Sequence, residues 1–278
     1  MTTWRLLDTG ALPASINMAI DEALLKLHAR GESPPTLRFY QWDPPAVSLG
    51  YFQRNHSIDV DACRNMGLDI VRRLTGGRAV LHQKDLTYSV VAGAREGIPI
   101  SLAAAYRLLC DGLLAGFRLL GFEAQRGQEN LRSARADICF MRSAVGDIVY
   151  NGKKFVGSAQ TWIGASLLQH GSIVLEPQSE TWAMIVAPAG MSRSALLEKL
   201  EAQTTSLHDL GCAVELGDVK AAIRTGMAQV LGLEFETGEL SSREWALARE
   251  LAVRHVDTNG SVTARPPGMR SSGCSAWR

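Results

Sequence analysis

The stretch DICFMRSAVGDIVYNGKKFVGSAQTWIGASLLQHGSIVL, residues 137–175, decides the fold. Within it, residues 145–150 and 154–160 alternate apolar and polar side chains on the two sides of Asn151-Gly152. An Asn-Gly pair favours the positive φ angles of a two-residue type I′ turn, so this stretch predicts a β-hairpin. A further strand is expected over 167–175, because β-forming residues continue almost to Pro177.

The same hairpin carries two side chains with reactive groups. Cys139 lies just before the outgoing strand and Lys154 at the start of the return strand, so a modest bend in the loop would bring thiol and ammonium together. A nearby ammonium favours the thiolate, which is the form that attacks carbonyl carbons. If the hairpin holds a catalytic centre, Cys139 is its nucleophile. The alternatives are a buried, inert Cys139 and a solvated Lys154 on an exposed strand.

Outward from the hairpin, the chain alternates between helical and strand-like patterns. Apolar residues recur at helical spacing in two long segments, residues 15–30 and 101–120. Strand-like segments are expected over residues 37–42, 46–52, 69–73, 79–81 and 86–92. We expect the first two of these strands to pair with each other across Asp43-Pro44-Pro45, which cannot continue either ladder.

The character of the chain changes after residue 190. Helical periodicity returns in three segments, residues 195–202, 219–231 and 242–256, and Ser241 with Glu244 forms a capping box before the last one. We therefore expect a catalytic core over 1–190 and a helical appendage over 191–256. Residues 257–278 contain two prolines and three glycines without periodicity, which predicts a poorly ordered tail.

The composition excludes several classes of function. A chain of 278 residues, 46% of them hydrophobic, buries a full core without metals or disulfides. Its net charge of +1, from 29 basic and 28 acidic residues, argues against nucleic acid as a partner. The five cysteines are widely spaced without a C-x-x-C pair, which favours reduced thiols in the cytoplasm over disulfides or structural zinc. No signal peptide and no apolar run long enough for a membrane span are expected.

Two glycine-rich segments are candidate binding elements. Residues 72–82, RRLTGGRAVLH, hold adjacent glycines between strands, where backbone amides approach an oxygen or a thioester carbonyl closely. Gly157-Ser158-Ala159 follows Lys154 with amides able to donate to an oxyanion. A simple turn is the alternative for the first segment. His170 is a candidate general base, and the alternative for His170 and for His82 is a structural, hydrogen-bonded histidine.

Seven blocks of sequence, taken in one order, resemble the biotin/lipoyl ligase family, and most closely its LipM-type octanoyltransferases. The blocks are NMAIDEALL (17–25), PTLRFYQW (35–42), RRLTGGRAVLH (72–82), LTYSVV (86–91), DICF (137–140), GKKFVGSAQ (152–160) and LLQHGSI (167–173). The resemblance covers about residues 15–245. It implies an α/β fold of the α+β type, in which a mixed, largely antiparallel sheet is flanked by helices and an acyl-chain tunnel lies beneath the glycine loop.

The resemblance also implies an activity and its residues. An octanoyl group moves from the thioester of acyl-carrier protein to an enzyme cysteine, Cys139 here, and then to one lysine of a lipoyl domain, typically the glycine-cleavage H protein. Lys154 matches the lysine that favours the thiolate of that cysteine. The positions that line the acyl site correspond to Arg73, Gly76, Gly77, His82, Ser158 and Ala159. Such a transfer needs no metal, no redox cofactor and no ATP, because a thioester is already activated.

Three other activities are alternatives. An amidotransferase of the same family moves octanoyl from H protein to other lipoyl domains through the same cysteine. An ATP-dependent lipoate ligase uses the same lysine position for adenylation, so the lysine does not separate the two activities. The presence of Cys139 argues against the ligase. A non-catalytic acyl-carrier binding protein would leave Cys139 inert. Trp162, where the family has a basic residue, bears on how the acceptor is recognised.

Overall fold

The chain folds into a large and a small β-sheet with helices packed around them. The computed structural model describes residues 2–53, 58–127, 147–186, 190–211 and 215–255. The predicted nucleophile Cys139 and the predicted tail 257–278 lie outside these residues.

Eight strands form the larger sheet. Their bounds are β1 Thr2–Leu12, β2 Thr36–Trp42, β6 Asp85–Gly93, β7 Gln125–Arg126, β8 Ile148–Tyr150, β9 Lys153–Ile163, β10 Ser166–Val174 and β11 Leu233–Thr237. Their order across the sheet is β11-β1-β2-β6-β10-β9-β8-β7. Pairing is parallel between β11 and β1 and between β1 and β2, and antiparallel from β2 to β7. The expected mixed, largely antiparallel sheet is therefore confirmed.

The smaller sheet has the order β4-β3-β5. Its strands are β3 Ala46–Leu49, β4 Asp69–Arg72 and β5 Val80–His82. The predicted pairing between residues 37–42 and 46–52 was wrong, because β2 lies in the large sheet whereas β3 pairs with β4 and β5. Pro44 and Pro45 have no amide hydrogen to donate, so the chain leaves one sheet at this point and enters the other.

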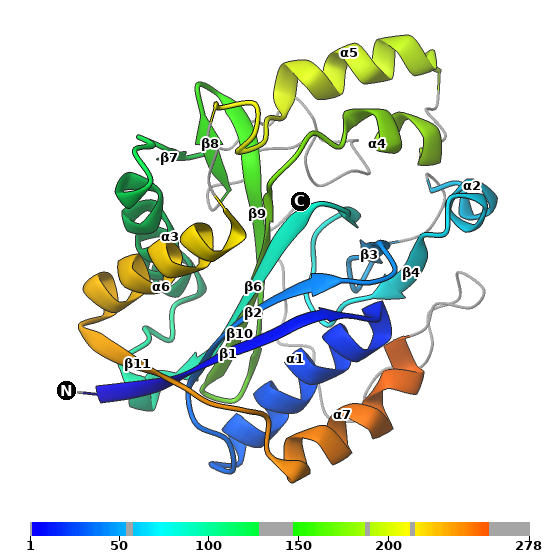
Figure 1. The fold of residues 1–278 in the computed structure, drawn as a ribbon. Coiled ribbons are helices and arrows are strands. Elements are labelled where there is room, and N and C mark those ends of the chain that lie inside the picture. Colours follow the sequence, from blue (N-terminus) through cyan, green and yellow to red (C-terminus); the bar gives the residue numbers. More distant parts are fainter. Residues whose placement is uncertain (1, 54–57, 128–146, 187–189, 212–214, 256–278) are drawn as a thin grey trace.

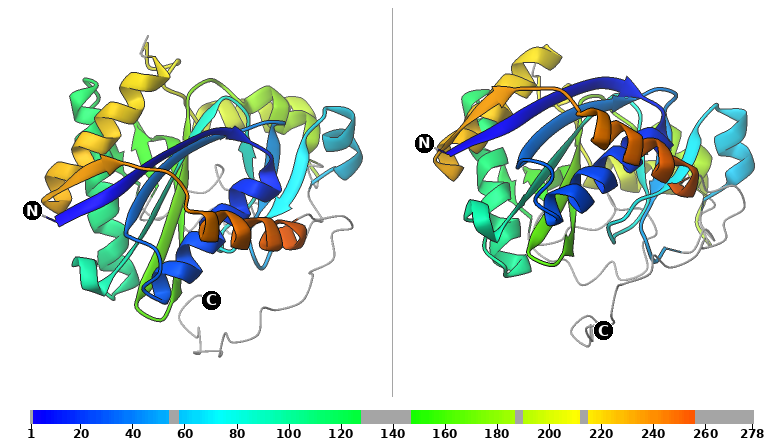
Figure 2. Two further views of the ribbon diagram at one scale, coloured as in Figure 1. Left: turned by 60° about the horizontal axis from the view of Figure 1, so that its bottom comes forward. Right: turned by 90° about the horizontal axis from the view of Figure 1, so that it is seen from below.

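The helices cover both faces of the large sheet. Their bounds are α1 Ala14–Ala29, α2 Val60–Asn65, α3 Leu102–Leu119, α4 Ser179–Ile185, α5 Arg193–Gln203, α6 Leu216–Leu231 and α7 Ser242–His255, with a short 3₁₀ helix at Ala94–Glu96. Figure 1 shows α3 beside α6 at one side of the sheet and α1 beside α7 at another. The two rotated views show the same two helix pairs lying along the sheet (Figure 2).

The predicted hairpin is confirmed as β8 and β9. The turn residues Asn151 and Gly152 have φ angles of 48° and 78°, as a type I′ turn requires. The return strand β9 continues for eleven residues and pairs with β10 along nearly its whole length. The hairpin therefore joins the β7–β8 edge to the centre of the sheet.

Alternation along the central strands separates an apolar face from a polar one. In β6, Leu86, Tyr88 and Val90 pack into the core beneath α3 and α6. The intervening Thr87 and Ser89 point to the opposite face, since successive side chains of a strand alternate. On neighbouring β10, Ile173 joins the apolar core, and the alternate positions His170 and Ser172 lie on the polar face. This buried polar face is where the candidate site forms.

The residues after 190 contribute to the same cores as the residues before it. Strand β11 pairs with β1, and Ile223 and Met227 of α6 pack with Phe117 of α3. Helix α7 packs on α1 through Leu251. The predicted capping box of α7 is present: the amide of Ser241 donates to Glu244 Oε2 at 2.7 Å, and the amide of Glu244 donates to Ser241 Oγ at 3.2 Å. Within the described residues, no helix is both long and apolar enough to cross a membrane.

Candidate active site

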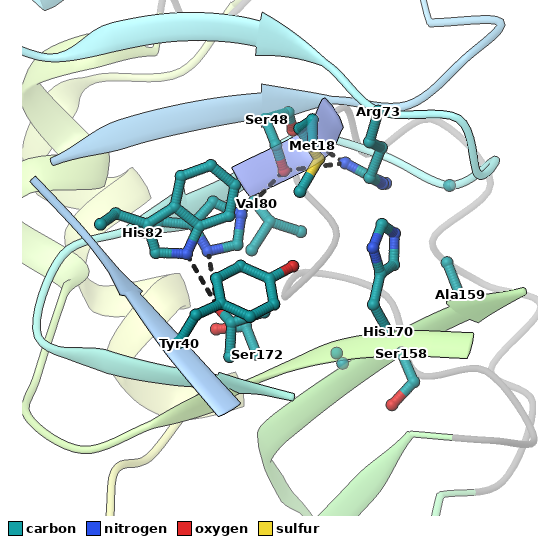
Figure 3. A pocket seen from close by; sticks show the side chains of 15 residues that line it. Met18, Tyr40, Ser48, Arg73, Val80, His82, Ser158, Ala159, His170 and Ser172 are labelled. Carbon is teal, nitrogen blue, oxygen red and sulfur yellow. Dashed lines mark hydrogen bonds between the residues drawn. The ribbon is translucent and has the colours of Figure 1, made fainter. Parts of the chain in front are cut away.

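A small cavity lies where the small sheet meets the polar face of the large one. Its lining comprises Met18, Tyr40, Trp42, Ser48, Arg73, Gly77, Val80, His82, Thr87, Gly157, Ser158, Ala159, His170, Gly171 and Ser172. Figure 3 shows side chains from both sheets and from α1 converging on this space. Met18, Trp42 and Val80 supply apolar walls.

The glycine loop, residues 75–78, forms one wall and is held by Arg73. This buried guanidinium donates to the carbonyl oxygens of Gly76 at 2.8 Å and Arg78 at 2.7 Å. Its other terminal nitrogen donates to the carbonyl oxygen of Ser48 in β3 at 2.8 Å. Arg73 therefore ties the loop to the small sheet, and Gly76 lies beside the cavity lining rather than in it.

Glycine is required at the tip of this loop. Gly77 has a φ angle of 96°, and a Cβ built there would lie 2.8 Å from Arg73 Nη2. Across from it, a Cβ on Gly50 would lie 2.0 Å from the carbonyl oxygen of Gly77. The loop and the segment after β3 therefore approach each other backbone to backbone, which a side chain at either position would prevent.

His82 lies at the other end of the cavity in a fully buried polar cluster. Its Nδ1 is 2.9 Å from Asp85 Oδ2 and its Nε2 is 2.8 Å from Ser48 Oγ. The ring stacks on Trp42 with 3.9 Å between centroids. Burial lowers the pKa of His82 below its ordinary value, although Asp85 acts in the opposite direction. Burial therefore favours the neutral ring of His82.

His170 belongs to a second buried cluster, centred on Asp21 of α1. The carboxylate of Asp21 accepts hydrogen bonds from Arg38, Tyr40 and Ser89, each at 2.8 Å. His170 Nδ1 lies 2.9 Å from Asp21 Oδ2, and His170 Nε2 lies 2.7 Å from Thr75 Oγ1 in the glycine loop. Both ring nitrogens of His170 are therefore engaged within the protein.

Ser158 and Ala159 lie next to each other on β9 with different surroundings. Ala159 pairs with His170 across the sheet. Ser158 Oγ lies 2.8 Å from the hydroxyl of Tyr88, and its carbonyl oxygen accepts from Tyr106 of α3 at 2.6 Å. Gly171 permits this arrangement, because a Cβ there would lie 2.5 Å from Ser158 Oγ.

Lys154 is buried and paired. It is 2% exposed, and its ammonium lies 2.8 Å from Asp147 Oδ2, which is 2% exposed as well. The neighbouring Lys153 is exposed and donates to the carbonyl oxygen of Glu201. The solvated alternative therefore describes Lys153 and does not describe Lys154. Asp147, just before β8, was missed because an acidic residue at a strand edge gives no pattern of its own.

The two described cysteines are poor nucleophiles. Burial raises the pKa of Cys63 to about 11 and that of Cys110 to about 12, with nearby carboxylates acting in the same direction. Both thiols are buried, where cysteine acts as a small hydrophobic side chain. Cys139, Cys212 and Cys274 lie outside the described residues.

The structure brings together most of the residues that the sequence singled out. Arg73, Gly77, His82, Ser158, Ala159 and His170 all line one cavity. The anchoring carboxylates Asp21 and Asp85 were missed. One signal for Asp21 was present, since Asn17 and Asp21 are polar residues one turn apart on the buried stripe of an apolar helix. Nothing comparable marks Asp85. Within the described segments, no cluster of His, Cys, Asp and Glu is arranged to hold a metal ion.

This arrangement suits binding and orienting an apolar chain with a polar end. The walls are largely apolar, Gly77 of the glycine loop contributes to the lining, and the two histidines are held in place by carboxylates. Lys154 lies on the same strand as the cavity residues Gly157 to Ala159.

Comparisons with known proteins agree on one family. The model of the lipoyl protein ligase A/B catalytic domain matches residues 13–228. A protein of Kyrpidia tusciae named octanoyltransferase LipM is 42% identical over 266 residues, covering 92% of this chain and 97% of that protein. A protein of the same name from Moorella thermoacetica is 43% identical over 263 residues, covering 91% and 96%.

Solved structures share the fold. A lipoate-protein ligase A bound with ATP superposes with a TM-score of 0.74 at 25% identity, covering 91% of this chain and 95% of that one. A bipartite lipoate protein ligase from Thermoplasma acidophilum gives a TM-score of 0.81 at 23% identity, covering 96% and 100%.

Proposed function

The chain belongs to the lipoyl protein ligase A/B catalytic domain family, and on that premise we propose that it is an octanoyltransferase of lipoate biosynthesis. The observation that carries the proposal is identity above 40%, over nine tenths of the chain, to proteins named octanoyltransferase LipM. The buried Lys154 supports it, because pairing with the carboxylate of Asp147 favours the ammonium form that stabilises a nearby thiolate.

In the proposed first step, the thiolate of Cys139 attacks the carbonyl carbon of an octanoyl thioester on acyl-carrier protein. A carbon–sulfur bond to the enzyme forms, and the phosphopantetheine thiol leaves as a thiolate that takes up a proton. The ammonium of Lys154 favours the thiolate of Cys139. No oxidant, reductant, ATP or metal enters the balance.

In the second step, the amine of one lysine on a lipoyl domain attacks the acyl-enzyme. An amide bond forms, the amine loses a proton, and the thiolate of Cys139 is released. The cavity between the glycine loop and β9 is the proposed acyl site, with Arg73 and Gly77 shaping its wall and His82 near its far end. Glycine-cleavage H protein is the proposed acceptor.

The test is formation of the acyl-enzyme. Incubation with octanoyl-acyl-carrier protein and intact mass measurement should show one octanoyl group added to the wild type and none added to Cys139→Ala. Cys63→Ala is the matched control, since this buried cysteine has a raised pKa and should leave the adduct unchanged. An unmodified wild-type enzyme, or an adduct that persists in Cys139→Ala, would contradict the proposal.

Two related activities are separated by choice of donor. Octanoyl-H protein as a better donor than octanoyl-acyl-carrier protein would assign the chain as an amidotransferase.

The likeness to an ATP-bound lipoate-protein ligase A makes adenylation the second candidate. Release of pyrophosphate on adding lipoate and ATP, with no acylation of Cys139, would assign the chain as a ligase.

A further inference from the structure

The buried cluster around His170 assigns that histidine a task different from proton transfer. Asp21 sits at its centre, fully buried, with four donors around its carboxylate: Arg38, Tyr40, Ser89 and His170. Burial alone would raise the pKa of Asp21, but the hydrogen bond from His170 and the charge of Arg38 outweigh it and hold that pKa below its ordinary value. Asp21 is therefore an ionised carboxylate that only accepts hydrogen bonds.

The ionised carboxylate fixes the orientation of His170. Since Asp21 cannot donate, the proton between them belongs to His170 Nδ1. The other ring nitrogen, Nε2, lies 2.7 Å from Thr75 Oγ1 and is hydrogen-bonded to the loop. The ring nitrogen that a general base would use is therefore engaged by a buried threonine hydroxyl.

Thr75 is the first residue of the glycine loop, and it is fully buried. Its carbonyl oxygen accepts from the amide of Tyr51 at 2.9 Å. Beyond Thr75, the carbonyl oxygens of Gly76 and Arg78 accept hydrogen bonds from Arg73. The loop is therefore pinned at successive residues, by Arg73 at its tip and by His170 at its base.

We propose that His170 is a positioning residue that acts through Thr75, holding the base of the glycine loop so that the loop forms the wall of the acyl cavity. Asp21 holds the ring in the orientation that makes this hydrogen bond possible. The inference rests on the proposed function for the identity of the bound acyl group. The hydrogen bond and its effect on the loop are independent of that identity.

The test compares Thr75→Val, which removes the hydroxyl at nearly constant volume, with Thr75→Ser, which retains it. In Thr75→Val the KM for octanoyl-acyl-carrier protein should rise about fivefold, as expected for loss of one neutral hydrogen bond, with kcat within about twofold. Thr75→Ser, which keeps the hydroxyl, should have the wild-type KM. A fall in kcat on replacing His170 by Asn, with no change in either Thr75 variant, would assign a general base and overturn the proposal.

Two measurements on the full chain need no substrate. In protein labelled with ¹⁵N-histidine, His170 should show a protonated Nδ1 and a hydrogen-bonded Nε2, and the Nε2 resonance should shift in Thr75→Val but not in Thr75→Ser. Hydrogen exchange of the amides at residues 76–79 should be faster in Thr75→Val alone. An Nε2 resonance that is unchanged in Thr75→Val, or unchanged exchange, would overturn the proposal even if octanoyl transfer is observed. If the wild type transfers no octanoyl group, the proposed function fails while these two measurements still decide the role of His170.

Discussion

Asp147 defines the electrostatic setting of Lys154. The two groups form an ion pair with almost no exposure to solvent. A buried ammonium without its carboxylate is costly, because desolvation of a charge is offset only by a close partner. The ion pair with Asp147 favours the charged form of Lys154, whereas a general base would need a neutral amine.

Replacing Asp147 by Asn tests this view. The substitution keeps the shape but removes the negative charge, so we expect the free energy of unfolding to fall by about 3 kcal/mol and octanoyl transfer to fall at least about tenfold. Urea unfolding and steady-state kinetics measure the two effects. The exposed neighbour Lys153→Ala is the control and should change stability by less than about 0.5 kcal/mol. Wild-type stability and rate in Asp147→Asn would show that the pair is dispensable.

At the scale of elements, α3 and α6 approach each other through glycines. A Cβ on Gly226 of α6 would lie 2.2 Å from the amide nitrogen of Gly116 and 2.5 Å from the carbonyl oxygen of Gly112, both in α3. The two helix backbones are therefore in direct contact over the apolar face of the large sheet. Substitution at this crossing forces the helices apart.

We expect Gly226→Ala to destabilise the protein by about 2 kcal/mol, the order of an overpacked core. The same helix supplies the control, since a Cβ on Gly217 meets no atom within 4 Å. Gly217→Ala should be neutral or stabilising by up to about 1 kcal/mol, because alanine favours helix more than glycine. Denaturant unfolding of both variants measures the difference. Equal stabilities would show that the helices move apart without cost.

Helix α7 is attached to α1 through Glu22. Its carboxylate pairs with His255 at 2.8 Å and with Lys26. Burial alone would raise the pKa of Glu22, but the hydrogen bonds from His255 and Lys26 lower it from 4.5 to about 2. A lowered carboxyl pKa contributes stability that is complete above the unfolded value and is lost as the pH falls toward the folded value.

Glu22→Gln should therefore be destabilised at pH 7, with a loss that shrinks between about pH 4.5 and pH 2. Urea unfolding midpoints of wild type and variant at pH 7, 4 and 3 give the comparison. The two curves should converge on the acid side because the wild type then loses the same charge. A difference that stays constant with pH would assign the effect to packing rather than to the charge.

At the scale of the whole molecule, local patterns in the sequence predicted where helices and strands lie better than which strands pair. The hairpin at Asn151-Gly152 and the long helices carry strong local signals, and the structure has them. Strands β1 and β11 were not predicted, and they pair with each other from opposite ends of the chain. The predicted β2–β3 pairing was wrong because a proline shows where a strand ends but not which sheet the next strand joins.

The same limit applies to the candidate site. Glycine-rich segments and histidines drew attention to Arg73, Gly77, His82 and His170, which share the lining of one cavity. The carboxylates that orient the histidines gave weak signals or none, since an aspartate on a helix or strand becomes informative only when its partner is known. Such a buried polar network forms only when distant parts of the chain meet in the folded protein, so local sequence patterns do not reveal it.

The last prediction concerns the stability of a fragment that ends at residue 190. A catalytic core over 1–190 would lose α5, α6, α7 and β11. Three hydrophobic cores would lose residues with them, namely Leu196, Leu200, Ile223, Met227 and Leu251. Helix α3 would expose the face that contacts α6, and β1 would become an open edge. Burial of apolar surface is the main stabilising term of folding, so the remaining sheet has too little cover to be stable.

We therefore expect the fragment 1–190 to show no cooperative thermal transition by circular dichroism and to bind a dye for exposed apolar surface, whereas the full chain unfolds in one step. Co-expression with a separate 191–278 fragment should restore a soluble complex, because the lost contacts are non-covalent. This rescue distinguishes missing packing from general damage to the fragment. A fragment 1–190 that unfolds cooperatively on its own would establish an independent core, and the segment after 190 would then be a true appendage.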